Sequence, residues 1–142
     1  MRTLLDTNIL LDVFLGRTGA QASGKAILAA CRKSRVALIS WHTLSNCYYI
    51  MRRGRMTHSG AITCLRRALR WAQVAGTGTS AALRAMDLPM ADFEDALQAA
   101  SAETEHADVI VTRNTKDFAN SPVPVLTPED FLAAYSAAGP LP

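Results

Sequence analysis

Two stretches of sequence decide the fold, residues 3–8 (TLLDTN) and residues 107–118 (ADVIVTRNTKDF). In each stretch a short apolar run ends in a cluster of polar side chains. Such runs are typical of strands that are buried on both faces of a sheet. The sequence therefore predicts buried strands over 3–5 and 108–112, each with polar groups at its carboxyl end.

Further strands and helices alternate along the rest of the chain. Strands are expected over 36–40, weakly over 73–79, and over 123–126, where Pro122 and Pro124 fit only an edge strand. Apolar residues at helical spacing predict helices over 7–15, 21–34, 41–53, 58–72, 80–86, 90–105 and 128–137. This alternation is typical of a parallel sheet covered on both faces. We expect residues 1–142 to form a single domain, a three-layer α/β/α sandwich with a central parallel sheet of about five strands.

Charged residues are segregated along the chain. Residues 13–86 contain twelve Lys and Arg and no Asp or Glu, whereas residues 87–142 contain ten acids and two cations. Segregation of this kind predicts a polyanionic or acidic partner, and Arg suits bidentate phosphate contacts. The alternative is solvated helix faces that the acidic part neutralises. Two clusters of cations are the candidates for polyanion binding: Arg52, Arg53 and Arg55, and Arg66, Arg67 and Arg70.

Cysteine usage and hydropathy bear on the compartment. Cys31, Cys47 and Cys64 are odd in number and lie far apart, which argues against a disulfide framework and a zinc site and predicts free thiols. No apolar run is long enough to span a membrane. Only three uncharged residues separate Arg2 from Asp6, so no signal-peptide core is expected. We therefore expect a cytoplasmic protein without a membrane partner.

Acidic side chains lie where a parallel sheet places its ligands. Asp6 follows the first strand and Asp117 the fourth, while Asp92 and Asp95 share one face of the helix at 90–105. Carboxylates without a cation between them repel, and a hard divalent cation such as Mg²⁺ would relieve that repulsion. Asp6, Asp92 and Asp117 each have a structural alternative as a helix or turn cap, whereas Asp95 lies beside the core stripe of its helix, where an unpaired carboxylate is costly. Glu94 is expected to point away from the shared face into solvent.

The ordered set of motifs resembles the PIN domain, the nuclease fold of VapC-type toxins. The stretches that carry the resemblance are LLDTN at 4–8, DFEDAL at 92–97, ADVIVTRN at 107–114 and KDF at 116–118. The resemblance covers nearly the whole chain and implies metal-dependent hydrolysis of RNA phosphodiester bonds with Mg²⁺ or Mn²⁺. By position the implied metal-holding acids are Asp6, Asp95 and Asp117. The implied supporting polar residues are Thr7, Asn8, Ser40, Thr112 and Asn114.

One position departs from the pattern of this family. PIN domains usually carry a second acid, commonly Glu, in the helix after the second strand. Aligning Ser40 with the family's strand-end Ser or Thr places Asn46 at that position. Asn offers a neutral carbonyl oxygen, so the site loses one negative charge, and Asp92 is the candidate to compensate. The pair Tyr48-Tyr49 follows Asn46, as in a subgroup of PIN-like proteins with Asn here.

The predicted function is that of an Mg²⁺- or Mn²⁺-dependent endoribonuclease, the toxin of a toxin–antitoxin pair. The expected partners are RNA, an antitoxin protein and a second copy of the chain in a homodimer. The alternative is a catalytically weak PIN-like module that binds RNA or protein. A doubly wound enzyme for small molecules is disfavoured because no glycine-rich phosphate loop follows the first strand.

Overall fold

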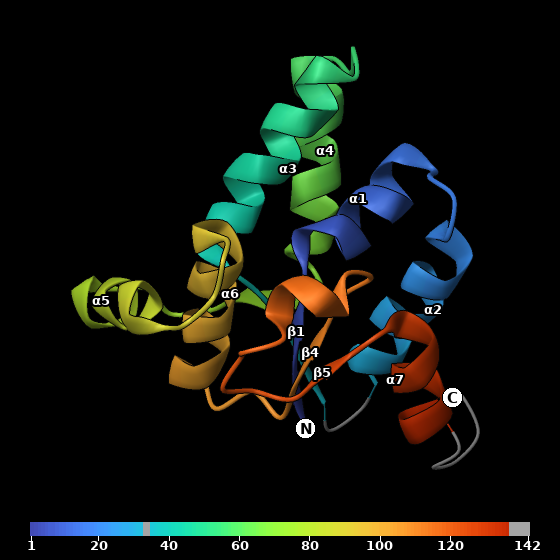
Figure 1. Ribbon diagram of the computed structural model, residues 1–142. Helices are drawn as coiled ribbons and strands as arrows, with labels where there is room; N and C mark the ends of the chain where they lie inside the picture. The colour runs from blue at the N-terminus through green and yellow to red at the C-terminus, as the bar shows by residue number, and fades with distance from the viewer. Residues whose placement is uncertain (33–34, 137–142) are drawn as a thin grey trace.

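A five-stranded parallel sheet lies at the centre of the computed structural model, which describes residues 1–32 and 35–136 (Figure 1). The strand order β3-β2-β1-β4-β5 puts β1 in the middle and β5 at an edge, as the two prolines predicted. Leu4 of β1 lies opposite both Leu38 and Ile110 in the register of the neighbouring strands. The strands are β1 (Arg2–Leu5), β2 (Val36–Ile39), β3 (Ala72–Val74), β4 (Val109–Val111) and β5 (Val125–Leu126).

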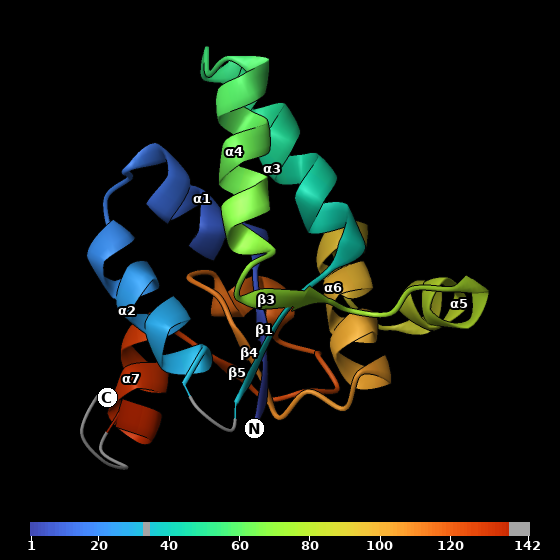
Figure 2. The ribbon, with the colours of Figure 1, turned by 180° about the vertical axis from the view of Figure 1, so that it is seen from behind.

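Helices cover both faces of the sheet, so the predicted three-layer arrangement is confirmed. They are α1 (Thr7–Leu15), α2 (Ala20–Ala30), α3 (Trp41–Arg53), α4 (His58–Ala68), α5 (Thr79–Asp87), α6 (Phe93–Thr104), α7 (Pro128–Ser136) and the 3-10 helix η1 (Thr115–Phe118). In both views α5 and α6 lie on one side, α1, α2 and α7 on the other, and α3 and α4 form a hairpin that projects beyond the sheet (Figures 1 and 2). No helix among the described residues is long and apolar enough to cross a bilayer.

Alternation along the strands divides the core into two parts. Leu5 and the strand residues beside it pack with α1, α2, α3, α4 and α7, whereas Leu4 and its neighbours pack with α5, α6 and η1. Successive side chains of a strand point to opposite faces. The central strands therefore carry consecutive apolar residues, Leu4 and Leu5 in β1 and Val109, Ile110 and Val111 in β4. Thr3 of β1 is also buried, although it is polar.

Several predicted boundaries differ from the structure. The strand expected over 73–79 is limited to Ala72–Val74, and α5 already begins at Thr79. The helix expected over 58–72 ends at Ala68, and Ala72 pairs with Ala37 in β3. This pairing occupies backbone groups on the free edge of β2 that would otherwise be unsatisfied. The long helix begins at Phe93 rather than Met90, since Asp92 caps it. The helix expected over 21–34 ends at Ala30, and its positions 33–34, like position 137 of the last helix, lie outside the described residues.

The three cysteines are free thiols, as predicted. Burial raises the pKa of Cys31 to about 11 and that of Cys47 to about 12. Both thiols therefore stay protonated at neutral pH, and the thiolate is the form that binds metals and reacts.

A buried charge fixes α1 to α2 and to the loop after β4. Asp12 is fully buried in α1. Its Oδ2 accepts from Ser23 Oγ at 2.7 Å, and its Oδ1 accepts from Arg113 Nη1 at 2.9 Å. Arg113 also donates to the carbonyl oxygen of Thr18 at 2.9 Å. The guanidinium thus holds the α1–α2 turn against the chain that leaves β4.

Arg113→Ala leaves the buried Asp12 carboxylate without its cation. We expect the free energy of unfolding to fall by about 1–3 kcal/mol, less than for a fully buried pair, because water replaces part of the contact at this exposed guanidinium. Urea unfolding of Arg113→Ala measures the loss, and Lys116→Ala, an exposed cation of η1, is the matched control. Equal stability of the two variants would contradict the role of Arg113.

Candidate active site at the carboxyl edge of the sheet

Three neighbouring strands end in buried polar residues at one edge of the sheet. Ser40 follows β2, Asp6 follows β1 and Thr112 follows β4, and they are 0, 3 and 0% exposed. The Asp6 N–H donates to the carbonyl oxygen of Val111 at 3.0 Å, which extends the β1–β4 pairing to the site. Parallel strands bring their carboxyl ends to the same edge. The polar clusters predicted from the sequence are therefore neighbours in space.

The carboxylate of Asp6 is held by two neutral donors. Asp6 occupies the N-cap position of α1, but its side chain makes no capping hydrogen bond, so the structural alternative for this residue is wrong. Gln98 Nε2 donates to its Oδ1 at 2.8 Å, and Thr112 Oγ1 donates to its Oδ2 at 2.7 Å. Burial raises the pKa of Asp6, and the charge of Glu94 raises it further, against the lowering effect of the two hydrogen bonds.

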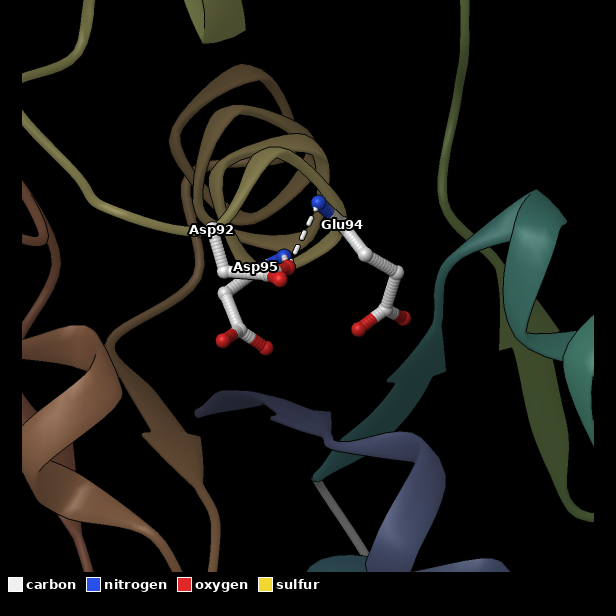
Figure 3. Close-up of side chains that lie close together, drawn as sticks. All are labelled: Asp92, Glu94 and Asp95. Carbon is white, nitrogen blue, oxygen red and sulfur yellow. Dashed lines mark hydrogen bonds between the residues drawn. The ribbon is translucent and has the colours of Figure 1, made fainter.

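The start of α6 presents three carboxylates. Asp92, Glu94 and Asp95 each place one carboxylate oxygen within 4.8 Å of the others (Figure 3). Asp92 Oδ1 accepts from the backbone N–H of Glu94 at 2.8 Å and of Asp95 at 3.1 Å. The cap alternative is therefore confirmed for Asp92. In Figure 3 the carboxylates of Glu94 and Asp95 both point toward the end of β1 and the start of α1.

Glu94 faces the site, and the prediction that it points into solvent is wrong. Its Oε1 accepts from Asn46 Nδ2 at 3.0 Å and from Gln98 Nε2 at 3.2 Å. Thr7 Oγ1 donates to the same atom at 3.4 Å, and His42 Nε2 lies 3.1 Å from it. The Glu94 side chain is long enough to reach polar groups of α1 and α3 from its position on α6. Helical spacing within α6 does not predict these contacts, because the partners belong to other helices.

Asp95 is surrounded by negative charge. Burial raises the pKa of Asp95 to about 7, and the carboxylates of Glu94, Asp6, Asp92 and Asp117 add to the rise. Asp117 is exposed on η1 and accepts a hydrogen bond from the side chain of Asn114. The charges of Asp6 and Asp117 thus act on Asp95, but the carboxylate oxygens that lie within 4.8 Å of one another are those of Asp92, Glu94 and Asp95.

The remaining predicted polar residues fall into two groups. Thr7 and Asn46 reach the site through Glu94, and the Thr112 hydroxyl both donates to Asp6 and accepts from the Asn114 N–H at 3.0 Å. The side chain of Asn8, by contrast, is exposed and has no side-chain hydrogen bond to another described residue.

The two arginine clusters lie at opposite ends of the α3–α4 hairpin. Arg52 and Arg53 form the last turn of α3, at the tip that projects from the sheet (Figure 1). Arg66 and Arg67 form the last turn of α4, which leads back to β3 (Figure 2). None of the clustered arginines forms an ion pair with a carboxylate within residues 1–32 and 35–136. Their charges are therefore not consumed within the described fold.

Comparison with known families agrees with this arrangement. Residues 2–116 match the family model described as the PIN domain. The chain belongs to the PIN domain family. The match spans every carboxylate of the cluster except Asp117, which follows its last residue. No curated protein matches the chain.

Solved structures similar to this PIN domain come from several bacteria. VapBC2 from Rickettsia felis, bound to a DNA fragment from their promoter, aligns at 20% identity and TM-score 0.70 over 89% of this chain and 98% of that one. A toxin–antitoxin complex from Klebsiella pneumoniae aligns at 28% identity and TM-score 0.67 over 89% and 97%. VapC20 from Mycobacterium tuberculosis, a sarcin–ricin loop cleaving toxin, aligns at 18% identity and TM-score 0.59 over 76% and 86%.

A divalent cation fits the donors of this PIN domain. Asp6 receives side-chain hydrogen bonds only from neutral groups, and Asp95 faces like charges. Ser40 Oγ and Gln98 Oε1 are buried and find no hydrogen-bond partner among the described residues. The Gln98 amide bridges Asp6 and Glu94, so its unpartnered oxygen belongs to the site. Carboxylate and carbonyl oxygens together are the ligands that Mg²⁺ and Mn²⁺ prefer.

Two residues of the site escaped the sequence analysis. Gln98 lies in the alanine-rich, buried face of α6, one turn after Glu94, and is itself fully buried. A lone amide in an apolar helical stripe is a signal, since burial of an unpaired polar group is costly. Glu94 was not predicted because Asp92 and Asp95, which are three residues apart, share a helix face from which Glu94 was expected to point away.

Asp95→Asn is expected to stabilise the protein at high pH. The pKa of about 7 exceeds the ordinary 3.8. The folded state therefore binds this proton more tightly, and stability is lost as pH rises from 4 through 7. Above pH 7 the free energy of unfolding of the variant should exceed that of the wild type by about 1–2 kcal/mol. This gain is smaller than the shift in pKa alone would give, because the carboxylate is partly exposed to solvent. At pH 4 the difference should nearly vanish.

Urea unfolding in EDTA at pH 4 and pH 8 measures this effect. Asp87→Asn, which removes an exposed carboxylate at the end of α5, is the control and should show no such pH dependence. A gain of the same size for Asp95→Asn at both pH values would contradict the crowding of charge around Asp95.

Proposed function

We propose that this PIN domain is an Mg²⁺- or Mn²⁺-dependent endoribonuclease and acts as the toxin of a toxin–antitoxin pair. The observation that carries the proposal is the cluster of carboxylates at the start of α6, on which the charges of Asp6 and Asp117 also act, while no Lys or Arg within residues 1–32 and 35–136 forms an ion pair with any of these acids. A cluster of this kind costs folding energy, and active sites are where such costs are retained. The similarity to a sarcin–ricin loop cleaving toxin supports the same activity.

Some side chains of the site would bind the cation, and others orient these ligands. Asp6, Asp95 and Asp117 would hold the divalent cation, with Thr112 and Gln98 orienting Asp6 and Asn114 orienting Asp117. Asp92 fixes the first turn of α6 and thereby the direction of Asp95. A bound divalent cation would lower the pKa of a water molecule and stabilise the negative charge on the leaving oxygen of a phosphodiester. Asp6 and Ser40 are buried at this edge, whereas Asp92 and Asp117 are exposed, so solvent and substrate can reach the site from the side of α6 and η1.

RNA is the proposed substrate because cations without carboxylate partners in the described part of the chain lie on the hairpin whose first helix, α3, begins directly after Ser40 at the site. Arg52, Arg53 and Arg55 and the cluster Arg66, Arg67 and Arg70 would contact phosphates irrespective of base sequence. The exposed ring of Tyr49 lies beside Arg52 and Arg53. An aromatic ring with guanidinium neighbours suits an unpaired base stacked on its face.

An antitoxin is the proposed protein partner. The toxin–antitoxin complex from Klebsiella pneumoniae supports this assignment. An apolar pocket of about 410 Å³ lies between α1, α2 and α4, and Phe14, Leu28 and Trp71 are among its lining residues. The Leu28 side chain is 66% exposed, so this surface can receive an apolar segment of the partner.

A homodimer is also proposed. Leu83 and Met86 expose most of their apolar surface on α5, and Trp41 and Phe93 do so at the starts of α3 and α6. Exposed large apolar side chains on neighbouring elements favour contact with a second copy of the chain. The side of the molecule that carries α5 and α6 is the expected contact face (Figures 1 and 2).

Asp95→Asn tests the nuclease directly. Removal of this carboxylate should lower the rate of Mn²⁺-dependent cleavage of a mixed single-stranded RNA by at least about a hundredfold, since it removes a metal-holding charge. Circular dichroism checks that the variant folds, and Asp87→Asn is the control. Wild-type protein that binds RNA but does not cleave it with either metal would instead favour the binding module.

Charge reversal on the hairpin tests RNA contact. In the Asp95→Asn background, Arg53→Glu/Arg55→Glu and Arg66→Glu/Arg70→Glu should each raise the Kd for single-stranded RNA by about tenfold or more and flatten its dependence on salt. Lys25→Glu, on α2 and outside both clusters, is the control and should have a smaller effect. Unchanged binding in both double variants would assign the arginines to a protein partner rather than to RNA.

A further inference from the structure

Glu94 is anchored through one of its two carboxylate oxygens. Asn46, Gln98 and Thr7 donate to Oε1 at 3.0, 3.2 and 3.4 Å, and His42 Nε2 lies 3.1 Å from it. These groups come from α1, α3 and α6. The other oxygen, Oε2, has no hydrogen bond to any residue within 1–32 and 35–136. A carboxylate held in this way has a fixed direction and one free oxygen.

Glu94 also lies within the electrostatic reach of the proposed metal-holding acids. Its charge raises the pKa of Asp6 and is the largest charge effect on Asp95. The buried amide of Gln98 donates to both Asp6 Oδ1 and Glu94 Oε1, which ties the two carboxylates into one network. The Oε1 of the Gln98 amide is buried and has no hydrogen-bond partner among the described residues.

Asp92, the other candidate for an additional charge, is placed differently. Its Oδ1 is occupied by two backbone N–H groups of α6, and its side chain is exposed. Asn46, in turn, uses its amide N–H to hold Glu94. The neutral residue on α3 and the acid on α6 therefore form a contacting pair at the position where the resemblance to PIN domains leads us to expect an acid.

We propose that Glu94 supplies from α6 the carboxylate that α3 lacks at Asn46, with its free oxygen directed at the divalent cation. The inference rests on the proposed nuclease function and adds one residue to its metal-holding set. Asn46 then acts as a positioning residue for Glu94 rather than as a metal ligand. The charge of the site is thereby restored by an acid on a different helix.

Glu94→Gln tests this assignment because it keeps the size of the side chain and one accepting oxygen for Asn46 and Gln98, while it removes the charge and replaces the free oxygen by an amide NH2. Calorimetric titration with Mn²⁺ alone should show affinity weakened by about tenfold or more. Glu103→Gln is the matched control on the same helix, since Glu103 pairs with Arg84 instead. Its Mn²⁺ affinity should equal that of the wild type.

Two further variants separate replacement of the acid from other roles. The double variant Asn46→Glu/Glu94→Gln returns the charge from α3 and should recover most of the lost Mn²⁺ affinity. Asn46→Glu alone puts two carboxylates in contact and should not tighten binding, because like charges raise each other's pKa. Tighter binding by this single variant would mean a vacant position and would overturn the proposal.

The outcomes distinguish this inference from the proposed function. Wild-type Mn²⁺ binding and RNA cleavage with unchanged affinity in Glu94→Gln would overturn the role of Glu94 and leave the nuclease intact. Weakened binding in Glu94→Gln without recovery in the double variant would show that Glu94 does not replace an acid of α3. A wild-type protein without Mn²⁺ affinity or cleavage would overturn the proposed function and the inference with it.

Discussion

The carboxylate of Asp6 is buried between the hydroxyl of Thr112 and the amide of Gln98, and this arrangement fixes β1, β4 and α6 around one point. A buried carboxylate needs hydrogen bonds, because its transfer from water is otherwise costly. Only neutral donors meet it here, so no cationic side chain of the described residues offsets the cost of ionising it, and burial raises its pKa. The other carboxylates of the site lie near Asp6 and repel one another when they are ionised. Apolar packing in the two parts of the core must offset the free-energy cost of this repulsion.

The first turn of α6 carries most of that repulsion. The positive end of the helix dipole favours acids there, and the Asp92 cap fixes the backbone from which Glu94 and Asp95 project. These effects only partly offset the crowding, as the raised pKa of Asp95 indicates. A site held in this state gains most from a ligand that brings positive charge, which is the physical basis for preferring a divalent cation to an organic cofactor.

The segregation of charge along the sequence becomes a segregation in space. Asp6, Asp92, Glu94, Asp95 and Asp117 lie at the carboxyl edge of the sheet and the start of α6, while the two arginine clusters lie at the ends of the α3–α4 hairpin. Arg84, Arg2 and Arg113 instead pair with carboxylates. Cations without carboxylate partners on the same molecule as an anionic site suit a polyanion whose phosphates need both a catalytic cation and contacts along the backbone.

The sequence by itself determined the layers, the parallel sheet and the strand ends at which Asp6, Ser40 and Thr112 lie. The reason is local: short, fully apolar strands that alternate with helices permit few other arrangements, and the carboxyl ends of parallel strands share one edge. Pro122 and Pro124 likewise fixed β5 at an edge, since neither can donate a backbone hydrogen bond. These conclusions needed no knowledge of how the helices pack.

Tertiary structure alone decided the contacts between helices. Helical spacing put Asp92 and Asp95 on one face, but the direction of Glu94 depends on Asn46, His42 and Thr7, which belong to other elements. Ala72 joined the sheet rather than α4 because the edge of β2 offered backbone partners. A long side chain near a helix start has several rotamers of similar energy, and only partners distant in sequence select among them.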